Sequence, residues 1–155
     1  MLLISLVSVT ANGADIWLFR HAEKATGEDP SLTSQGHLRA QRIADIILSA
    51  PSTNGQLRLF TTDYQRTRQT ITPLAEASDK ELGVYHPAQL EALAAELRLL
   101  PGTLVVAGHS NTTPRLLKLL TGLERTIPED RFDQLFHLIP TIDGFKLEEL
   151  SSNSP

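Results

Sequence analysis

Two arginines and two histidines follow three apolar segments of the chain, at the points where those segments end. Arg20 and His21 come directly after DIWLF, Arg66 lies shortly after LRLF, and His109 follows TLVVAG. A guanidinium group presents a planar fork that suits phosphate or carboxylate oxygens. A neutral imidazole can attack phosphorus, and a second imidazole can donate a hydrogen bond to the transferring group. These residue types therefore predict an anion site that could carry out phosphoryl transfer.

The same inventory disfavours several other kinds of site. Neighbouring arginines oppose a divalent metal, and no His-x-x-x-His spacing supplies its ligands, so we expect no metal and no cofactor. The formal net charge of -4, from 14 basic and 18 acidic residues, gives no support for a nucleic-acid or anionic-membrane partner. The absence of cysteine excludes disulfides, thiolate ligands and cysteine nucleophiles.

Helical patterns follow most of the apolar segments. Thr33 is a plausible N-cap for a first helix, in which Leu38, Ile43, Ile46 and Ile47 recur at helical spacing. YQRTRQTITPLAEA predicts a second helix that contains a proline, and PAQLEALAAELRLL predicts a third that opens at Pro87. A fourth helix is expected around PRLLKLLTGL, with a proline in its first turn and a glycine at its end.

The strands place the chemical residues at one edge of a sheet. DIWLF, LRLFTT, GVYH and TLVVAG predict strands that alternate with the helices, which indicates a mainly parallel sheet. Near the C-terminus, DQLFHLI and FKLEEL flank Asp143-Gly144, a hairpin signal. We therefore expect an α/β fold: a three-layer α/β/α sandwich with a mostly parallel central sheet and an antiparallel C-terminal edge hairpin. Ligands of such folds bind at the carboxyl ends of the strands.

The N-terminal segment, residues 1–13, is apolar and then small and polar, and it is too short to span a bilayer. We expect a signal peptide, with Val9 and Ala11 at a small-residue cleavage site and a periplasmic or secreted product. The segment lacks a basic n-region, so a cytoplasmic protein with an N-terminal extension is the alternative. The 155-residue length suits one domain, which we place at residues 14–150, with 151–155 as a tail.

Three segments, LFRHAEK, TTDYQRTRQT and VVAGHSNT, resemble the signature segments of the histidine phosphatase (phosphoglycerate mutase-like) superfamily, in the same order and after strands. LTSQGHLRAQRIADIIL also resembles a helix of that family, so that the likeness spans residues 14–150. The Arg-His-Ala-Glu-Lys form is similar to small bacterial members that often carry export signals. The resemblance implies that His21 is the phosphorylated nucleophile and that Arg20 and Arg66 grip the phosphoryl oxygens. It also implies that His109 is the second histidine. Asn111 and Thr112 would lie at the pocket edge.

The proton donor is the least defined part of this resemblance. Many members carry a glutamate soon after the third strand, and Glu91 lies nearest to that place, although on a predicted helix. Glu23 lies close to the nucleophile, and His86 stands where the third strand ends. We rank Glu91 first, with Glu23, His86 or no dedicated donor as alternatives.

The resulting functional hypothesis is a metal-independent phosphatase that forms a covalent phosphohistidine on His21. The interval between Arg66 and His109 holds a strand and a helix but no large insertion, so we expect an open pocket. Such a pocket suits a small-molecule or protein-borne phosphate, such as phosphohistidine or a phosphorylated glycan. A phosphoglycerate mutase and a non-catalytic phosphate-binding module are the alternatives.

Overall fold

The computed structural model describes residues 13–51 and 56–155. The expected signal segment therefore lies outside the described residues, apart from Gly13. Within the described ranges, no helix is long and apolar enough to cross a membrane. In chain order the elements are β1 (Asp15–Arg20), α1 (Ser34–Ser49), β2 (Leu57–Thr61), α2 (Gln65–Ser78), β3 (Leu82–Val84), α3 (Leu90–Leu99), β4 (Thr103–Gly108), α4 (Thr112–Thr121), β5 (Gln134–Thr141) and β6 (Gly144–Ser151).

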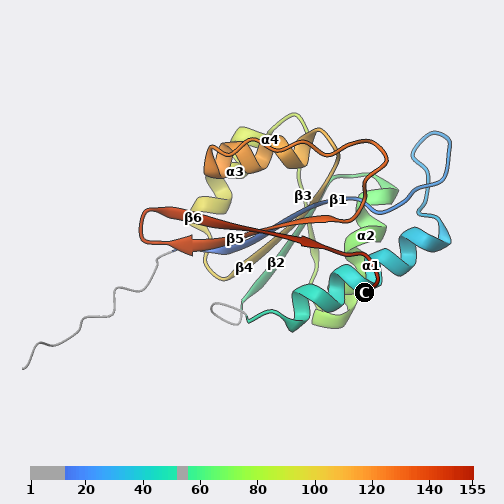
Figure 1. Ribbon diagram of the computed structural model, residues 1–155, viewed down its shortest axis with the longest axis horizontal. Coiled ribbons are helices and arrows are strands. Elements are labelled where there is room, and N and C mark those ends of the chain that lie inside the picture. Colours follow the sequence, from blue (N-terminus) through green and yellow to red (C-terminus); the bar gives the residue numbers. More distant parts are fainter. Residues whose placement is uncertain (1–12, 52–55) are drawn as a thin grey trace, which may run out of the picture.

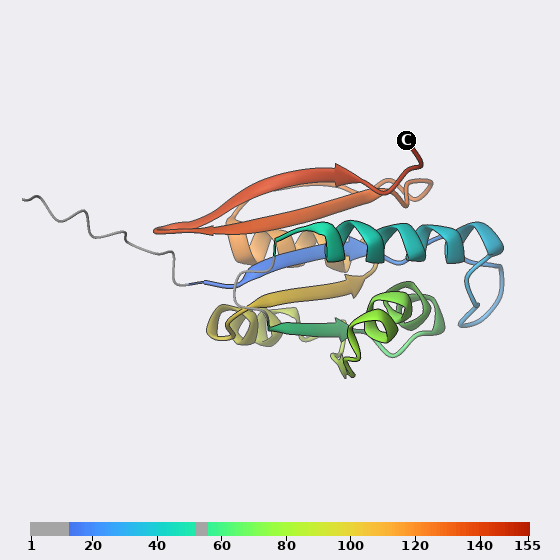
Figure 2. The ribbon, with the colours of Figure 1, turned by 90° about the horizontal axis from the view of Figure 1, so that it is seen from below.

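The strands form a six-stranded sheet in the order β3-β2-β4-β1-β5-β6. Strand β4 pairs in parallel with β1 and with β2, and β2 pairs in parallel with β3. Strand β5 runs antiparallel to both β1 and β6. Figure 2 shows the β5–β6 hairpin along one side of the molecule. The predicted mostly parallel sheet and the C-terminal edge hairpin are both confirmed.

Helices cover both faces of this sheet (Figure 1). The alternation of side chains along β1 shows why, because Ile16 and Leu18 pack in one buried cluster with α3 and α4. Trp17 and Phe19 point the other way and pack in a second cluster with α1 and α2. A strand buried on both faces needs apolar residues at every position, which explains the continuous apolar run in the sequence. The three-layer architecture is therefore confirmed.

Two helix boundaries lie at the predicted capping residues, the start of α1 at Thr33 and the end of α4 at Gly122. The Thr33 hydroxyl accepts a hydrogen bond from the Gly36 N–H at 3.1 Å and caps α1. Gly122 ends α4 with a left-handed φ of 76° and donates to the Lys118 carbonyl at 2.8 Å. Both boundaries are therefore fixed by local hydrogen bonds that the sequence predicts.

Two sequence expectations differ from the structure. Helix α3 begins at Leu90 rather than at Pro87, because the intervening residues form a turn in which the Gln89 N–H donates to the His86 carbonyl at 2.9 Å. Leu38 is 64% exposed, although we grouped it with Ile43, which is buried; the two are five positions apart, so at 3.6 residues per turn they lie on different sides of the helix. Leu38 lies in the first turns of α1, on a side of the helix that does not contact the sheet clusters.

The residues after β6 take part in the packing. Ser152 is buried, and its hydroxyl accepts from Arg39 Nη1 at 2.9 Å. Its carbonyl oxygen accepts from Arg42 Nε at 2.7 Å. The segment that we expected to be a tail thus begins with residues that tie the hairpin to α1.

Candidate active site

The parallel pairing of β1 and β4 brings the two predicted histidines together. Arg20 is in register with Gly108, and the His21 N–H donates to the Gly108 carbonyl at 2.9 Å. His21 and His109 therefore leave adjacent strands at the same level, with their ring centroids 5.6 Å apart. They line an open pocket of about 460 Å³ together with four other predicted residues, Arg20, Arg66, Asn111 and Thr112.

His21 lines this pocket, and a hydrogen bond fixes which of its ring nitrogens is protonated. Its Nδ1 lies 2.8 Å from the Ala22 carbonyl oxygen, and because a carbonyl only accepts, the ring proton must be on Nδ1. The lone pair is then on Nε2. Burial is the main cause that lowers the pKa of His21 to about 4, and the charges of Arg20, His109 and Arg66 lower it further. His21 is therefore neutral at pH 7, as a nucleophile must be.

Arg20 lines the pocket and is held in place by the loop that precedes β5. Its Nη1 donates to the carbonyl oxygens of Glu129 at 2.9 Å and Arg131 at 2.8 Å, with Pro128 at 3.3 Å. The ring of Phe132 lies against the guanidinium, 4.1 Å from the centroid. The Nε of Arg20 is buried and has no hydrogen-bond partner within residues 13–51 and 56–155. The loop thus fixes the guanidinium plane, while the Nε N–H makes no hydrogen bond within the described residues.

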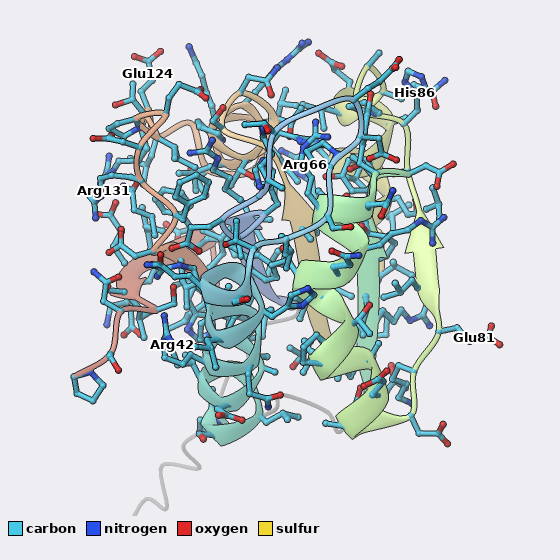
Figure 3. All side chains as sticks on the ribbon, turned by 90° about the vertical axis from the view of Figure 1, so that its right-hand side faces the viewer. Arg42, Arg66, Glu81, His86, Glu124 and Arg131 are labelled. Carbon is cyan, nitrogen blue, oxygen red and sulfur yellow. The ribbon has the colours of Figure 1, made fainter. Side chains whose placement is uncertain are left out.

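Arg66 supplies a second donor of the same kind from the first turn of α2. Its guanidinium lies over the ring of Tyr64, 4.4 Å from the centroid, and its Nη1 is 3.9 Å from Asp29 Oδ1. Its Nε is also buried without a hydrogen-bond partner in the described part of the chain. Figure 3 views the edge of the sheet that carries these residues, with Arg66 near its centre. Unpaired buried donors are costly, so two of them beside one pocket indicate an anion site.

A chain of hydroxyl groups fixes the orientation of His109. The Thr67 hydroxyl donates to the carbonyl oxygens of Thr62 and Tyr64, at 3.1 and 3.0 Å, so it must accept from the Thr62 hydroxyl, 2.8 Å away. Thr62 in turn lies 2.8 Å from His109 Nε2 and accepts from its N–H. Burial, and then Arg66 and Arg20, lower the pKa of His109 to about 4. In the free protein, Nδ1 of His109 therefore carries a lone pair.

Close packing brings the backbone of β4 and α4 to the pocket. A Cβ added at Gly108 would lie 2.8 Å from Thr113 Oγ1 and 2.9 Å from Thr112 Oγ1, so only glycine fits there. The His109 N–H donates to Thr112 Oγ1 at 3.0 Å. Helix α4 thus begins beside the second histidine, where its positive dipole end favours an anion.

The three candidate proton donors lie apart from the pocket lining. Glu91 is exposed on α3 and pairs with Arg115. Glu23 is bound through both oxygens by Arg39, at 2.8 to 3.0 Å. His86 accepts from the Ala88 N–H at 3.1 Å and lies toward the periphery in Figure 3, away from Arg66. The structure brings none of these three to the pocket wall that it describes.

Comparison with known proteins finds no matching family model and no curated relative. Solved structures do match. The protein histidine phosphatase SixA complexed with tungstate superposes with a TM-score of 0.64 at 14% identity, over 89% of this chain and 97% of that one. Phosphoserine phosphatase from Entamoeba histolytica superposes with a TM-score of 0.64 at 15% identity, over 90% of this chain and 98% of that one. Mycobacterial glucosyl-3-phosphoglycerate phosphatase Rv2419c superposes with a TM-score of 0.63 at 12% identity, over 90% of this chain and 99% of that one.

The chain has the phosphoglycerate mutase-like fold. The match covers nearly all of each neighbour. At these identities the likeness establishes the fold, and the chemistry must be argued from the site itself.

The site on this phosphoglycerate mutase-like fold also includes residues that the sequence did not single out. The pocket is lined by Lys24, Tyr64, Ser110 and Glu129 in addition to the predicted residues. Glu129 belongs to ERTIPEDRFD, a segment whose composition is typical of a surface loop. No local pattern marks it, because its place depends on β5 pairing with β1. No group of three or more side chains that could hold a metal ion occurs among the residues described.

Proposed function

We propose that this protein is a metal-independent phosphomonoesterase of the histidine phosphatase superfamily, acting through a covalent phosphohistidine on His21. One observation carries the proposal. A neutral imidazole lies in the same pocket as two buried guanidinium Nε donors that have no hydrogen-bond partner among the described residues. A phosphoryl group bound in this pocket would lie beside both guanidinium groups and the His21 imidazole, which line it together.

In the first step, the His21 Nε2 lone pair attacks phosphorus and the bond to the leaving oxygen breaks. Arg20 and Arg66 hold the non-bridging oxygens, so that the charge on the transferring group is neutralised as it moves. His109 gains a proton when the anion binds, because the added negative charge favours the imidazolium form. Its Nδ1 can then donate to the same group. In the second step, water attacks phosphorus, and His21 leaves with its lone pair restored.

The open pocket favours a substrate whose phosphate is exposed or attached to a bulky group. Lys24, Tyr64 and Ser110 at its wall add one cation, one aromatic ring and one hydroxyl. We propose phosphohistidine on a protein, or a phosphorylated sugar of an envelope glycan, as the substrate class. The structural neighbour named as a protein histidine phosphatase is in keeping with the first of these.

Hydrolysis of p-nitrophenyl phosphate in the presence of EDTA tests the proposal. Wild type should turn the substrate over, and His21→Ala should abolish turnover. His37→Ala is the matched control, because His37 is an exposed histidine on α1 outside the pocket lining. No turnover by wild type, or undiminished turnover by His21→Ala, would remove the proposal. Conversion of 3- to 2-phosphoglycerate far faster than hydrolysis would point to a mutase, and phosphate binding without turnover to a binding module.

We further propose that the chain is exported to the periplasm or secreted, from the character of residues 1–13. Cell fractionation with N-terminal sequencing of the mature protein tests this. An uncleaved N-terminus on protein recovered from the cytoplasm would contradict it.

A further inference from the structure

The proposed reaction needs a group that protonates the leaving oxygen and later takes a proton from water. Glu129 is the one carboxylate that lines the pocket in the described part of the chain. The expected donors Glu91 and Glu23 are instead paired with arginines elsewhere. Glu129 lies in the loop between α4 and β5.

The Glu129 side chain is positioned at the pocket but free to move. Its Oε1 accepts a hydrogen bond from the Ser110 hydroxyl at 2.6 Å, and its Oε2 lies 3.3 Å from Arg20 Nη2. Its backbone carbonyl is bound by Arg20 Nη1 at 2.9 Å, which anchors the main chain. The side chain is 83% exposed, so it can rotate toward the pocket mouth without displacing packed groups.

Anion binding changes the charge around this carboxylate. In the free protein, the Ser110 hydrogen bond and then the charge of Arg20 lower the pKa of Glu129. A phosphoryl group bound to Arg20 neutralises that guanidinium and adds a negative charge next to the carboxylate. Both changes raise the pKa of Glu129. The carboxylate that faces Arg20 in the free protein therefore becomes a better proton carrier when substrate is present.

We propose that Glu129 is the general acid and base of the reaction, an inference that rests on the phosphatase function proposed above. As His21 Nε2 bonds to phosphorus, the bond from phosphorus to the leaving oxygen breaks, and that oxygen takes the proton of the Glu129 carboxylic acid. The alcohol then leaves. Water next attacks phosphorus while the Glu129 carboxylate accepts one of its protons, and the bond from phosphorus to Nε2 breaks. Phosphate leaves, and Glu129 is protonated again for the next cycle.

The dependence of the rate on the leaving group tests this role. Glu129→Gln keeps the shape of the side chain but cannot carry the proton. It should lower kcat/KM for benzyl phosphate by about 10²-fold, the usual contribution of a general acid. It should leave kcat/KM for 2,4-dinitrophenyl phosphate within about 3-fold, because so weakly basic a leaving group departs without protonation. With the latter substrate, the variant should accumulate phosphoenzyme and show a burst, because the water step has lost its base.

Asp130→Asn is the matched control. Asp130 lies next in the same loop and acts on Arg20 through its charge, but it does not line the pocket. Asp130→Asn should keep the wild-type ratio of the two substrates. An equal loss on both substrates in Glu129→Gln, or no loss on either, would overturn the assignment while leaving the phosphatase function intact. A wild type that hydrolyses neither substrate, or a His21→Ala variant that hydrolyses both, would instead overturn the function and the inference with it.

Discussion

Acidification from pH 7 to pH 5 should destabilise the protein through His21 and His109. Burial, aided by Arg20 and Arg66, lowers the pKa of both imidazoles from 6.5 to about 4. Between these two values the unfolded chain binds protons that the folded chain does not. The free energy of unfolding therefore rises with pH across this window and falls as the solution is acidified.

The size of the effect follows from the two pKa values. The pKa of each histidine is 6.5 in the unfolded chain and about 4 in the folded protein. Below pH 4 this difference lowers the free energy of unfolding by its full amount, about 3 kcal/mol for each histidine. Integration from pH 7 to pH 5 gives about 2 kcal/mol for each. Glu23 and Glu129 have lowered pKa values and lose their contribution only at more acidic pH. Against a total stability of about 5–15 kcal/mol, this loss is readily measured.

Urea unfolding at pH 7, 6 and 5 provides the assay, with wild type, His21→Gln and His109→Gln. Each variant should lose roughly half of the pH dependence that the two histidines give wild type, about 2 kcal/mol. Inorganic phosphate added at pH 5 should restore much of the wild-type stability, because the anion pairs with the imidazolium forms. If both variants lose stability on acidification as steeply as wild type, the reasoning about these two groups is refuted.

Three substitutions test other parts of the account. Arg66→Lys keeps the charge but removes the Nε donor, so kcat/KM for p-nitrophenyl phosphate should fall by about 10- to 100-fold, which steady-state kinetics would show; wild-type kinetics would contradict the role of that donor. Thr62→Val leaves His109 Nε2 unpaired and should cost about 1–3 kcal/mol in urea unfolding, and an unchanged midpoint would argue against the hydroxyl chain. Gly36→Ala puts a Cβ 2.1 Å from the Glu23 carbonyl oxygen and should lower the free energy of unfolding by about 1–3 kcal/mol. Thermal melting measures this loss, and a gain in stability would contradict the close contact.

The placement of the candidate pocket could be predicted from the sequence, because it depends on strand direction. Each chemical residue stands at or just after the carboxyl end of a strand, as with Arg20 on β1 and His109 after β4. Parallel strands bring such ends to one edge whatever their distance along the chain. The roles assigned to these residues stay predictions until activity is measured.

The pocket wall could not be predicted in the same way. Glu129 reaches Arg20 across 109 positions of sequence, through a loop whose place is set by the antiparallel β5. Its composition resembles that of any solvated loop, so neither periodicity nor spacing marks it. The predicted start of α3 was wrong for a local reason, because Pro87 suits a helix N-terminus but here lies inside the turn closed by His86 and Gln89.

Trapping the covalent intermediate tests the central claim most directly. Wild-type protein mixed rapidly with a ³²P-labelled phosphate monoester and quenched in base should carry label on the peptide that contains His21. That label should survive alkali and be lost in acid, as expected for phosphohistidine. His21→Ala should carry none. A label that survives acid, a label on another residue, or turnover without any labelled protein would contradict nucleophilic catalysis by His21.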